Sequence, residues 1–216
     1  MSINNENQEQ EKKKLTKKQK RIIAVTAIVL LIIILLLLLL LPKKIKNSGI
    51  PTLTIVTPPK QSISAHEEFS VDVSLSALGE EIYPAVSASI VFDSSHLEFI
   101  GISEGDIMIL GDERADGNSN QLPEWSVDIE HSNKIGQINV MYLDMTGGKY
   151  AFTKECMEDN HILMRLNFKL RGSAKAGDIY NLEITDAVFA TTDESKNLAS
   201  INDTLITNDG KVVVTQ

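Results

Sequence analysis

From residue 50 onward the chain alternates between apolar and polar residues in several stretches. In FSVDVSLSA, which runs from Phe69 to Ala77, every second residue is apolar and the residues between them are Ser or Asp. VSASIVF, from Val86 to Phe92, alternates in the same way except at Val91, an apolar residue at an outward position. Because successive side chains of a strand point to opposite faces, each stretch predicts a strand with one buried face and one exposed face.

The same criterion predicts further strands and no long helix in this part of the chain. Stretches rich in Gly, Asp, Asn and Ser separate them and are typical of exposed loops. Short strands without intervening helices favour two antiparallel sheets packed face to face, whereas parallel winding would need alternating helices. We therefore predict an all-β antiparallel sandwich with nine strands, at residues 53–57, 69–77, 86–92, 97–103, 125–131, 137–144, 162–170, 180–190 and 211–215.

A different pattern occupies residues 22–41, which form an uncharged apolar run of 20 residues. A helix rises about 1.5 Å per residue, so this run would cross roughly 30 Å of hydrocarbon. A cleaved signal peptide would have a shorter apolar core, of about 7–15 residues, followed by small residues. Here Pro42, Lys43 and Lys44 follow. We expect a retained transmembrane signal anchor that contacts membrane lipid.

The formal net charge of −8 divides into +7 over the first 49 residues and −15 over the remaining 167. Seven basic residues precede the apolar run and three follow it. The positive-inside rule then places residues 1–21 in the cytoplasm as a disordered basic tail. Residues 42–52 form a linker, and residues 53–216 an extracellular domain at the cell membrane. Since topology accounts for the basic cluster, no nucleic-acid partner is expected.

The sequence shows no pattern of catalytic or metal-binding chemistry. A single cysteine, Cys156, excludes an internal disulfide. The four histidines are scattered, without the spacing of a zinc site. In the loop at residues 111–120, Asp112 and Asp116 have the spacing of a calcium loop, but Arg114 stands where an oxygen ligand is required. We expect neither an enzyme nor a cofactor site on this chain.

Several segments of the outer domain, taken in order, resemble motifs of the cohesin family. They are VSASIVFDSSHLEFIGISEGDIM from Val86, INVMYLDMTGG from Ile138, HILMRLNFKLRGSAKAGDIYNLEIT from His161, and the closing segments DAVFATTDES and NDGKVVV. Each segment alone is a generic strand pattern, so the resemblance depends on their order and spacing. It covers nearly the whole of residues 53–216.

The resemblance implies a jelly-roll sandwich that docks calcium-loaded dockerin modules carried by secreted proteins, such as polysaccharide-degrading enzymes. Any calcium would then belong to the dockerin and not to this chain. In cohesins the strand matching 86–93 lies beside the strand matching 137–144 on the docking face. The implied partner-binding residues are Ser87, Ser89, Asn139, Met141 and Leu143.

The strand predicted at 125–131 would complete this face with Ser126, Asp128 and Glu130 pointing outward. There is one departure from the family pattern. Type I cohesins commonly carry an Asn and an Asp two residues apart where this chain has Ala85 and Ser87.

Two other functions remain open on the sequence: a carbohydrate-binding module, which would bind polysaccharide, and a structural or sensory cell-surface domain. Fold alone does not distinguish them from a docking module. Sugar binding by a sheet face usually needs exposed aromatic rings, and only 5% of the residues are aromatic. The sequence therefore favours docking.

Overall fold

The computed structural model describes residues 49–62, 68–108, 122–157, 159 and 161–216. All of them belong to one compact unit, Ser48–Gln216. The predicted tail, the predicted membrane segment at 22–41 and the loop at 111–120 lie outside the described residues. No helix within the described part of the chain is long and apolar enough to cross a membrane.

The unit is built almost entirely from strands. The strands are β1 (Thr52–Ile55), β2 (Gln61–Ser62), β3 (Phe69–Leu75), β4 (Ala85–Phe92), β5 (Leu97–Glu104), β6 (Ser126–Val127), β7 (Gln137–Leu143), β8 (Ile162–Leu170), β9 (Ile179–Ala190), β10 (Leu198–Ala199), β11 (Ile206–Asn208) and β12 (Gly210–Thr215). The helices are α3 (Ile129–Ile135) and three short 3₁₀ turns, η3 (Glu155–Met157), η4 (Glu194–Lys196) and η5 (Ser200–Asn202).

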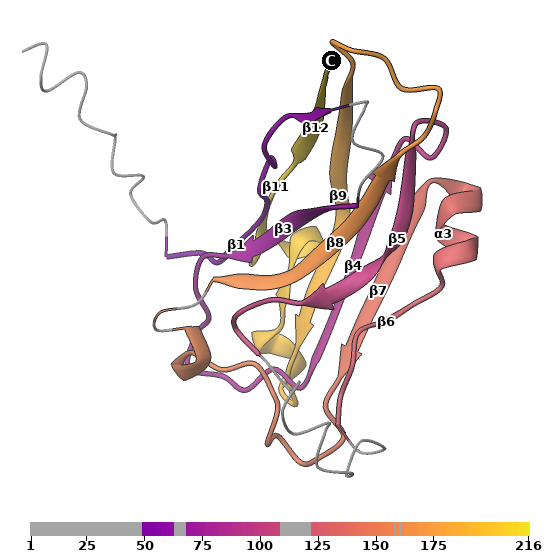
Figure 1. The fold of residues 1–216 in the computed structure, drawn as a ribbon. Coiled ribbons are helices and arrows are strands. Elements are labelled where there is room, and N and C mark those ends of the chain that lie inside the picture. The colour runs from indigo at the N-terminus through magenta and orange to yellow at the C-terminus, as the bar shows by residue number, and fades with distance from the viewer. Residues whose placement is uncertain (1–48, 63–67, 109–121, 158, 160) are drawn as a thin grey trace, which may run out of the picture. The chain divides into compact units, whose positions relative to one another are not determined.

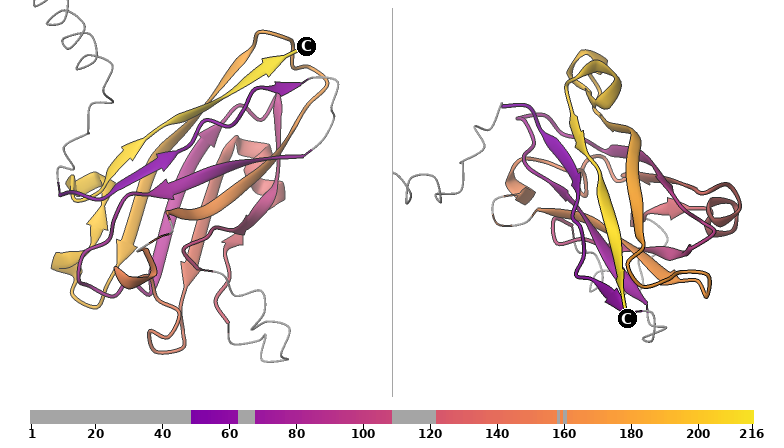
Figure 2. Two further views of the ribbon diagram at one scale, coloured as in Figure 1. Left: turned by 60° about the vertical axis from the view of Figure 1, so that its left-hand side comes forward. Right: turned by 90° about the horizontal axis from the view of Figure 1, so that it is seen from above.

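These strands form two sheets, which Figures 1 and 2 show as two layers. The first sheet has the order β11-β1-β3-β8-β5. The second has the order β2-β12-β9-β4-β7-β6, and β10 pairs with β9. The all-β two-sheet prediction is confirmed.

The predicted number of strands and the wholly antiparallel pairing are wrong. The described residues contain twelve strands, and β1 pairs with β11, and β2 with β12, in parallel. The cause lies near the two ends of the unit, where the chain passes from one sheet to the other and back. The short strands β2, β10 and β11 form there, and two or three residues are too few to show a period-two pattern.

Inward-facing side chains from both sheets form one core. The alternation predicted for β3 and β4 is confirmed, because Val71 and Val73 are 0% exposed and Ile90 is also 0% exposed. The ring of Phe168 on β8 lies 5.6 Å from that of Phe92 on β4, so aromatic contact joins the two sheets. Burial of each such side chain stabilises the fold by about 1.5–3 kcal/mol.

The prediction of a strand at 125–131 is correct only for Ser126 and Val127 and is wrong for the residues that follow. Only Ser126–Val127 is a strand, and α3 follows. The Asp128 carboxylate caps this helix by accepting the His131 N–H at 2.8 Å, and Gly136 ends it with a φ of 71°. Asp128 and Glu130 therefore do not point outward from a strand, because local capping outweighs the alternating pattern.

Helix α3 also covers the edge of the first sheet at β5. The Asn133 side chain accepts the Phe99 N–H at 2.9 Å and donates to the Phe99 carbonyl at 2.7 Å. One side chain thus replaces the neighbouring strand that β5 lacks at this point. Such covering protects a strand edge from pairing with another chain.

We expect Asn133→Ala to lower the free energy of unfolding by about 1–3 kcal/mol, because both backbone groups of Phe99 would lose their partner. Denaturant unfolding followed by circular dichroism measures this change. The control is Asn181→Ala on β9, an exposed position where less than about 0.5 kcal/mol is expected. Equal effects of the two substitutions would show that Asn133 does not hold this edge.

Candidate functional site: the outward face of β9, β4 and β7

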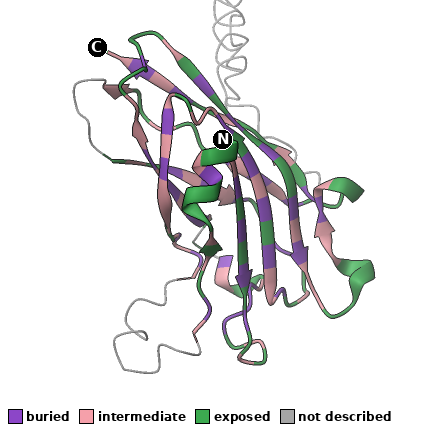
Figure 3. Ribbon diagram, turned by 90° about the vertical axis from the view of Figure 1, so that its right-hand side faces the viewer, coloured by how far each residue is buried: buried purple, intermediate pink, exposed green. Residues whose placement is uncertain are grey.

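Strand β4 lies between β7 and β9, and the outward side of these three strands forms the candidate site. In the β4–β7 ladder Ser87 is paired with Met141, and Ser89 with Asn139. Leu143 is the next outward position beyond Met141. The structure therefore brings together the five residues that the sequence analysis expected on one face; their role in binding stays a prediction. Figure 3 views the molecule from the α3 side and shows this alternation of buried and exposed positions.

Strand β9 adds residues to this face that the sequence analysis missed. Val188 is paired with Ser87, and Asp186 with Ser89. A strand at 180–190 was predicted, but its pattern does not say which strand it pairs with. A β-bulge follows Ser89 and leaves Thr185 and Asp186 both exposed, so simple alternation could not give the phase of β9.

One end of the face is apolar and hollowed. Met141 is 52% exposed, Leu143 45% and Met145 84%. Beside them lies a hollow of about 620 Å³. Its lining residues are Leu122, Pro123, Glu124, Ser126, Met141, Leu143, Met145 and Thr146. A contiguous exposed apolar region of this kind is typical of a contact site, whereas single exposed apolar residues are ordinary.

The turn that carries Met145 is fixed by a buried carboxylate. Asp144 is 6% exposed and accepts the backbone N–H groups of Thr146 at 2.8 Å and of Tyr150 at 3.2 Å. Burial acts to raise the pKa of Asp144, but hydrogen bonds from Thr146, Tyr150 and Gly148 together hold it below its usual range. The carboxylate thus stays charged and keeps Met145 at the rim of the hollow.

The other end of the face is polar. Asn139 Oδ1 accepts hydrogen bonds from the Ser89 hydroxyl at 2.9 Å and from Gln137 Nε2 at 2.8 Å. These bonds fix the Asn139 carboxamide in one orientation. Because Oδ1 is held by two hydrogen bonds, the position of the Asn139 amide nitrogen is also fixed. A partner would therefore contact an ordered polar surface.

The outward face of the first sheet differs in how its charges are satisfied. Asp72 pairs with Arg165 at 3.3 Å, and Glu68 with Lys169 at 2.9 Å. On the candidate face, Asp186 has no ion pair within the residues that the structure describes. These two carboxylates of the first sheet are therefore neutralised by basic side chains, whereas Asp186 on the candidate face is not paired in this way among the described residues.

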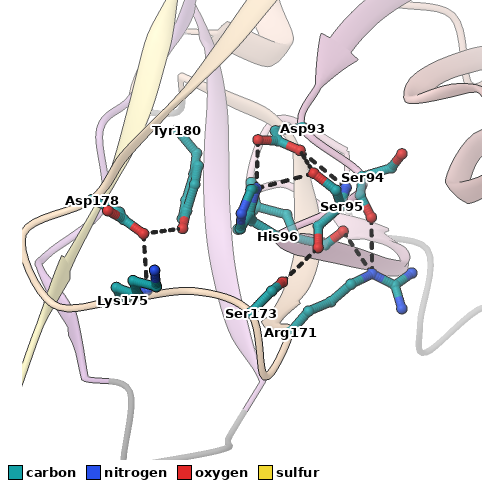
Figure 4. Close-up of polar contacts among 10 residues, drawn as sticks. Asp93, Ser94, Ser95, His96, Arg171, Ser173, Lys175, Asp178 and Tyr180 are labelled. Atoms are coloured by element: carbon teal, nitrogen blue, oxygen red, sulfur yellow. Dashed lines mark hydrogen bonds and ion pairs between the residues drawn. The ribbon is translucent and has the colours of Figure 1, made fainter.

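A second polar cluster lies where the turns after β4 and β8 meet (Figure 4). The His96 ring stacks on Tyr180 with centroids 4.9 Å apart, and its Nδ1 lies 2.7 Å from Asp93. The Tyr180 hydroxyl donates to Asp178 at 2.6 Å. Burial, followed by this hydrogen bond, raises the pKa of Tyr180 to about 12. Since these groups pair with one another, the cluster joins the two turns.

No three His, Cys, Asp or Glu side chains converge to hold a metal ion in the described ranges. Cys156 is a free thiol, half-buried, and it donates to the Thr153 carbonyl at 2.8 Å. The calcium-like pattern at 111–120 lies outside the described residues.

The chain is similar to known proteins over the whole of this unit. The sequence profile of the cohesin domain matches residues 54–214. No curated protein matches the chain.

Solved cohesin structures show the same fold at low sequence identity. The third ScaC cohesin of Acetivibrio cellulolyticus, solved with the ScaB dockerin, is 19% identical, with a TM-score of 0.55 over 77% of this chain and 99% of that chain. The OlpA cohesin of Clostridium thermocellum, in a type I cohesin–dockerin complex, is 18% identical, with a TM-score of 0.54 over 76% and 99%. A non-cellulosomal cohesin of Archaeoglobus fulgidus is 11% identical, with a TM-score of 0.50 over 77% and 91%.

We expect Asp144→Asn to lower the free energy of unfolding near pH 7 by about 1–3 kcal/mol, because an amide cannot replace a carboxylate that accepts several N–H groups. The native pKa of Asp144 is lowered. Its contribution is therefore present above the unfolded value of about 3.9 and is lost as pH falls through the native value. Denaturant unfolding at pH 7 and at pH 3 should show the variant losing less stability than the wild type.

The control is Asp159→Asn, at an exposed position. It should unfold as the wild type does at both pH values. An equal loss of stability in the Asp144→Asn variant and the wild type between pH 7 and pH 3 would exclude the proposed role of this carboxylate.

Proposed function

Since the chain belongs to the cohesin domain family, we propose that it is a docking protein that binds dockerin-bearing extracellular proteins non-covalently. The outward face of β9, β4 and β7 would form the binding surface. The observation that carries the proposal is the apolar group formed there by Met141, Leu143 and Met145 beside a hollow. Two of the similar cohesins, from Acetivibrio cellulolyticus and Clostridium thermocellum, were solved in complex with dockerins.

The physical character of this face supports docking. Protein interfaces combine a central apolar region with a polar surround, and a few apolar or aromatic anchors contribute most of the binding energy. Here Met141 and Leu143 lie beside the ordered polar group of Ser89 and Asn139. Met141 and Leu143 are each about half exposed, so their complete burial would together contribute about 1.5–3 kcal/mol, before the costs of association.

Carbohydrate binding is less well supported by the surface. The chain has one Trp, four Tyr and six Phe, and all of them lie in the described residues. None of these aromatic side chains is exposed. Phe69 and Trp125 are half-buried, and the other nine are buried. A sheet face without an exposed ring offers no platform on which a pyranose could stack.

We further propose that residues 22–41 anchor the docking domain in the cell membrane, with the basic tail at residues 1–21 in the cytoplasm. The support is the uncharged run of 20 residues and the excess of basic residues before it. Residues 42–52 would hold the domain near the membrane on the outer side. The docked protein, for example a polysaccharide-degrading enzyme, would then be kept at the cell surface.

We expect Met141→Asp and Leu143→Asp each to weaken capture of dockerin-bearing secreted proteins at least 100-fold, because a carboxylate would lose its water on binding without gaining a partner. The measurement is pull-down and biolayer interferometry with the full-length chain in detergent and secreted proteins of the same organism. Chelation of calcium should abolish capture, since the calcium belongs to the dockerin.

The matched control is Val56→Asp, which places the same charge directly after β1, away from the candidate face, at a position that is 43% exposed. It should bind as the wild type does. Normal binding by both face variants would show that the face is wrongly assigned. Retention on insoluble polysaccharide, without capture of any protein, would favour the carbohydrate-binding function instead.

We expect the full-length chain to stay in the membrane fraction after alkaline carbonate extraction, and a chain that begins at Ser48 to be released. Protease added to intact cells should digest the C-terminal domain and leave the basic tail protected. Protection of the C-terminal domain would reverse the proposed orientation.

A further inference from the structure

Two methionine side chains carry the exposed sulfur atoms of the described residues. Met141 and Met145 are both exposed. Met157 and Met164 are buried in the core, and Met108 is half-buried against it. The accessible thioethers are thus gathered on one surface, the apolar end of the face formed by β9, β4 and β7.

The backbone holds both thioethers at this surface. Met141 occupies an outward position of β7. Met145 follows on the turn in which the buried Asp144 carboxylate accepts backbone N–H groups, and the Asp144 N–H donates to the Pro84 carbonyl at 2.7 Å. Both methionines line the same hollow. A small oxidant dissolved in water therefore reaches each sulfur without any opening of the fold.

A thioether reacts with a peroxide by accepting one oxygen atom. The lone pair of Sδ attacks one oxygen of hydrogen peroxide, the S–O bond forms as the O–O bond breaks, and the other oxygen leaves as water with both protons. The sulfur is oxidised by two electrons and the peroxide is reduced by two. The product, methionine sulfoxide, is polar where the thioether was apolar. A sulfoxide oxygen that is buried in an interface without a donor loses its hydrogen bonds to water, which weakens binding.

The other easily oxidised side chains of the described residues are less accessible. Cys156 is half-buried, and its Sγ donates to the Thr153 carbonyl at 2.8 Å and accepts the Thr153 N–H at 3.3 Å. Trp125 is half-buried, and its ring centroid lies 5.3 Å from that of Tyr142. Mild oxidation should therefore change the candidate docking face first and leave the packing of the core intact.

We propose that Met141 and Met145 are modification sites, at which a peroxide outside the cell forms sulfoxides and thereby releases the docked protein. The inference rests on the proposed function and adds the regulation of its binding surface. Leu143, which lies between the two methionines, is not oxidised in this way and retains part of the apolar area, so binding is weakened and not abolished. Reduction by methionine sulfoxide reductases restores the apolar surface.

Docking and oxidation should oppose each other. A bound partner that covers the hollow keeps dissolved peroxide away from both thioethers. The docked chain should therefore be oxidised at Met141 and Met145 more slowly than the free chain.

The experiment oxidises the full-length chain in detergent with hydrogen peroxide and removes the peroxide with catalase before a partner is added. Peptide mass spectrometry should find one added oxygen at Met141 and Met145 before any at Met157 or Met164. Affinity for the calcium-loaded protein that the wild type captures should fall at least about 10-fold, less than for Met141→Asp because a sulfoxide carries no net charge. Treatment with both types of methionine sulfoxide reductase should restore it.

Two double variants separate these sites from the rest of the chain. Met141→Gln/Met145→Gln places neutral polar side chains at both positions, and its affinity should match that of the oxidised wild type. Met141→Leu/Met145→Leu is compared only with itself, and peroxide should leave its affinity unchanged. The matched control is Met108→Leu, at a half-buried position outside the face, which should respond to peroxide as the wild type does.

Oxidation of both methionines in the wild type without loss of binding would overturn the proposal. An equal response to peroxide in the Leu double variant would also overturn it, because the sensitive group would lie elsewhere. A lower melting temperature of the oxidised chain would assign the lost binding to the core instead of the face, and equal oxidation of the free and docked chains would contradict the shielding. Failure of the untreated chain to capture any dockerin would instead reject the proposed function, and the inference with it.

Discussion

The hydrogen bonding of β4 on both of its edges is the constraint on which the rest of the structure depends. Its ladders with β7 and β9 are the longest of the second sheet, and its inward residues Val86, Ile90 and Phe92 are buried in the core. A shift of one residue would expose Ile90 and bury Ser87. Burial of the apolar residues therefore fixes the register of β4 with β7 and β9, and this register also determines which residues lie on the candidate docking face.

The sequence predicts those parts of the fold in which alternation is long. Alternation predicts which side chains of β3 and β4 are buried. The pairing of Ser87 with Met141 follows once the family resemblance is added. The pairing of β9 with β4 does not, because a strand pattern says nothing about its neighbour. The contribution of Asp186 was missed for the same reason. Helix α3 was missed although Asp128 and Gly136 have the spacing of its two caps, since these short local signals compete with an apparent strand.

The two outward surfaces of the sandwich differ in how their charged side chains are paired. The first sheet pairs its carboxylates with Arg and Lys of neighbouring strands, which gives a self-contained surface. The second keeps an ordered amide at Asn139 and leaves Asp186 without such a pair among the described residues. With the turn at Asp144 already fixed, little conformational entropy remains to be lost on binding. A fixed surface and an unpaired carboxylate on the same face would favour a partner of complementary shape and charge over other proteins.

The position of β1 also has a mechanical consequence. This strand lies between β3 and β11, and the hydrogen bonds at its beginning run to both sides, from Ser76 to the Thr52 carbonyl and from Ile206 to the Pro51 carbonyl, each at 2.9 Å. A tensile force applied at residue 49 along the strand axis would load the bonds of both ladders in shear, all at once, and would not peel them apart one after another. The domain is therefore built to bear traction at the end of the chain that leads toward the proposed anchor.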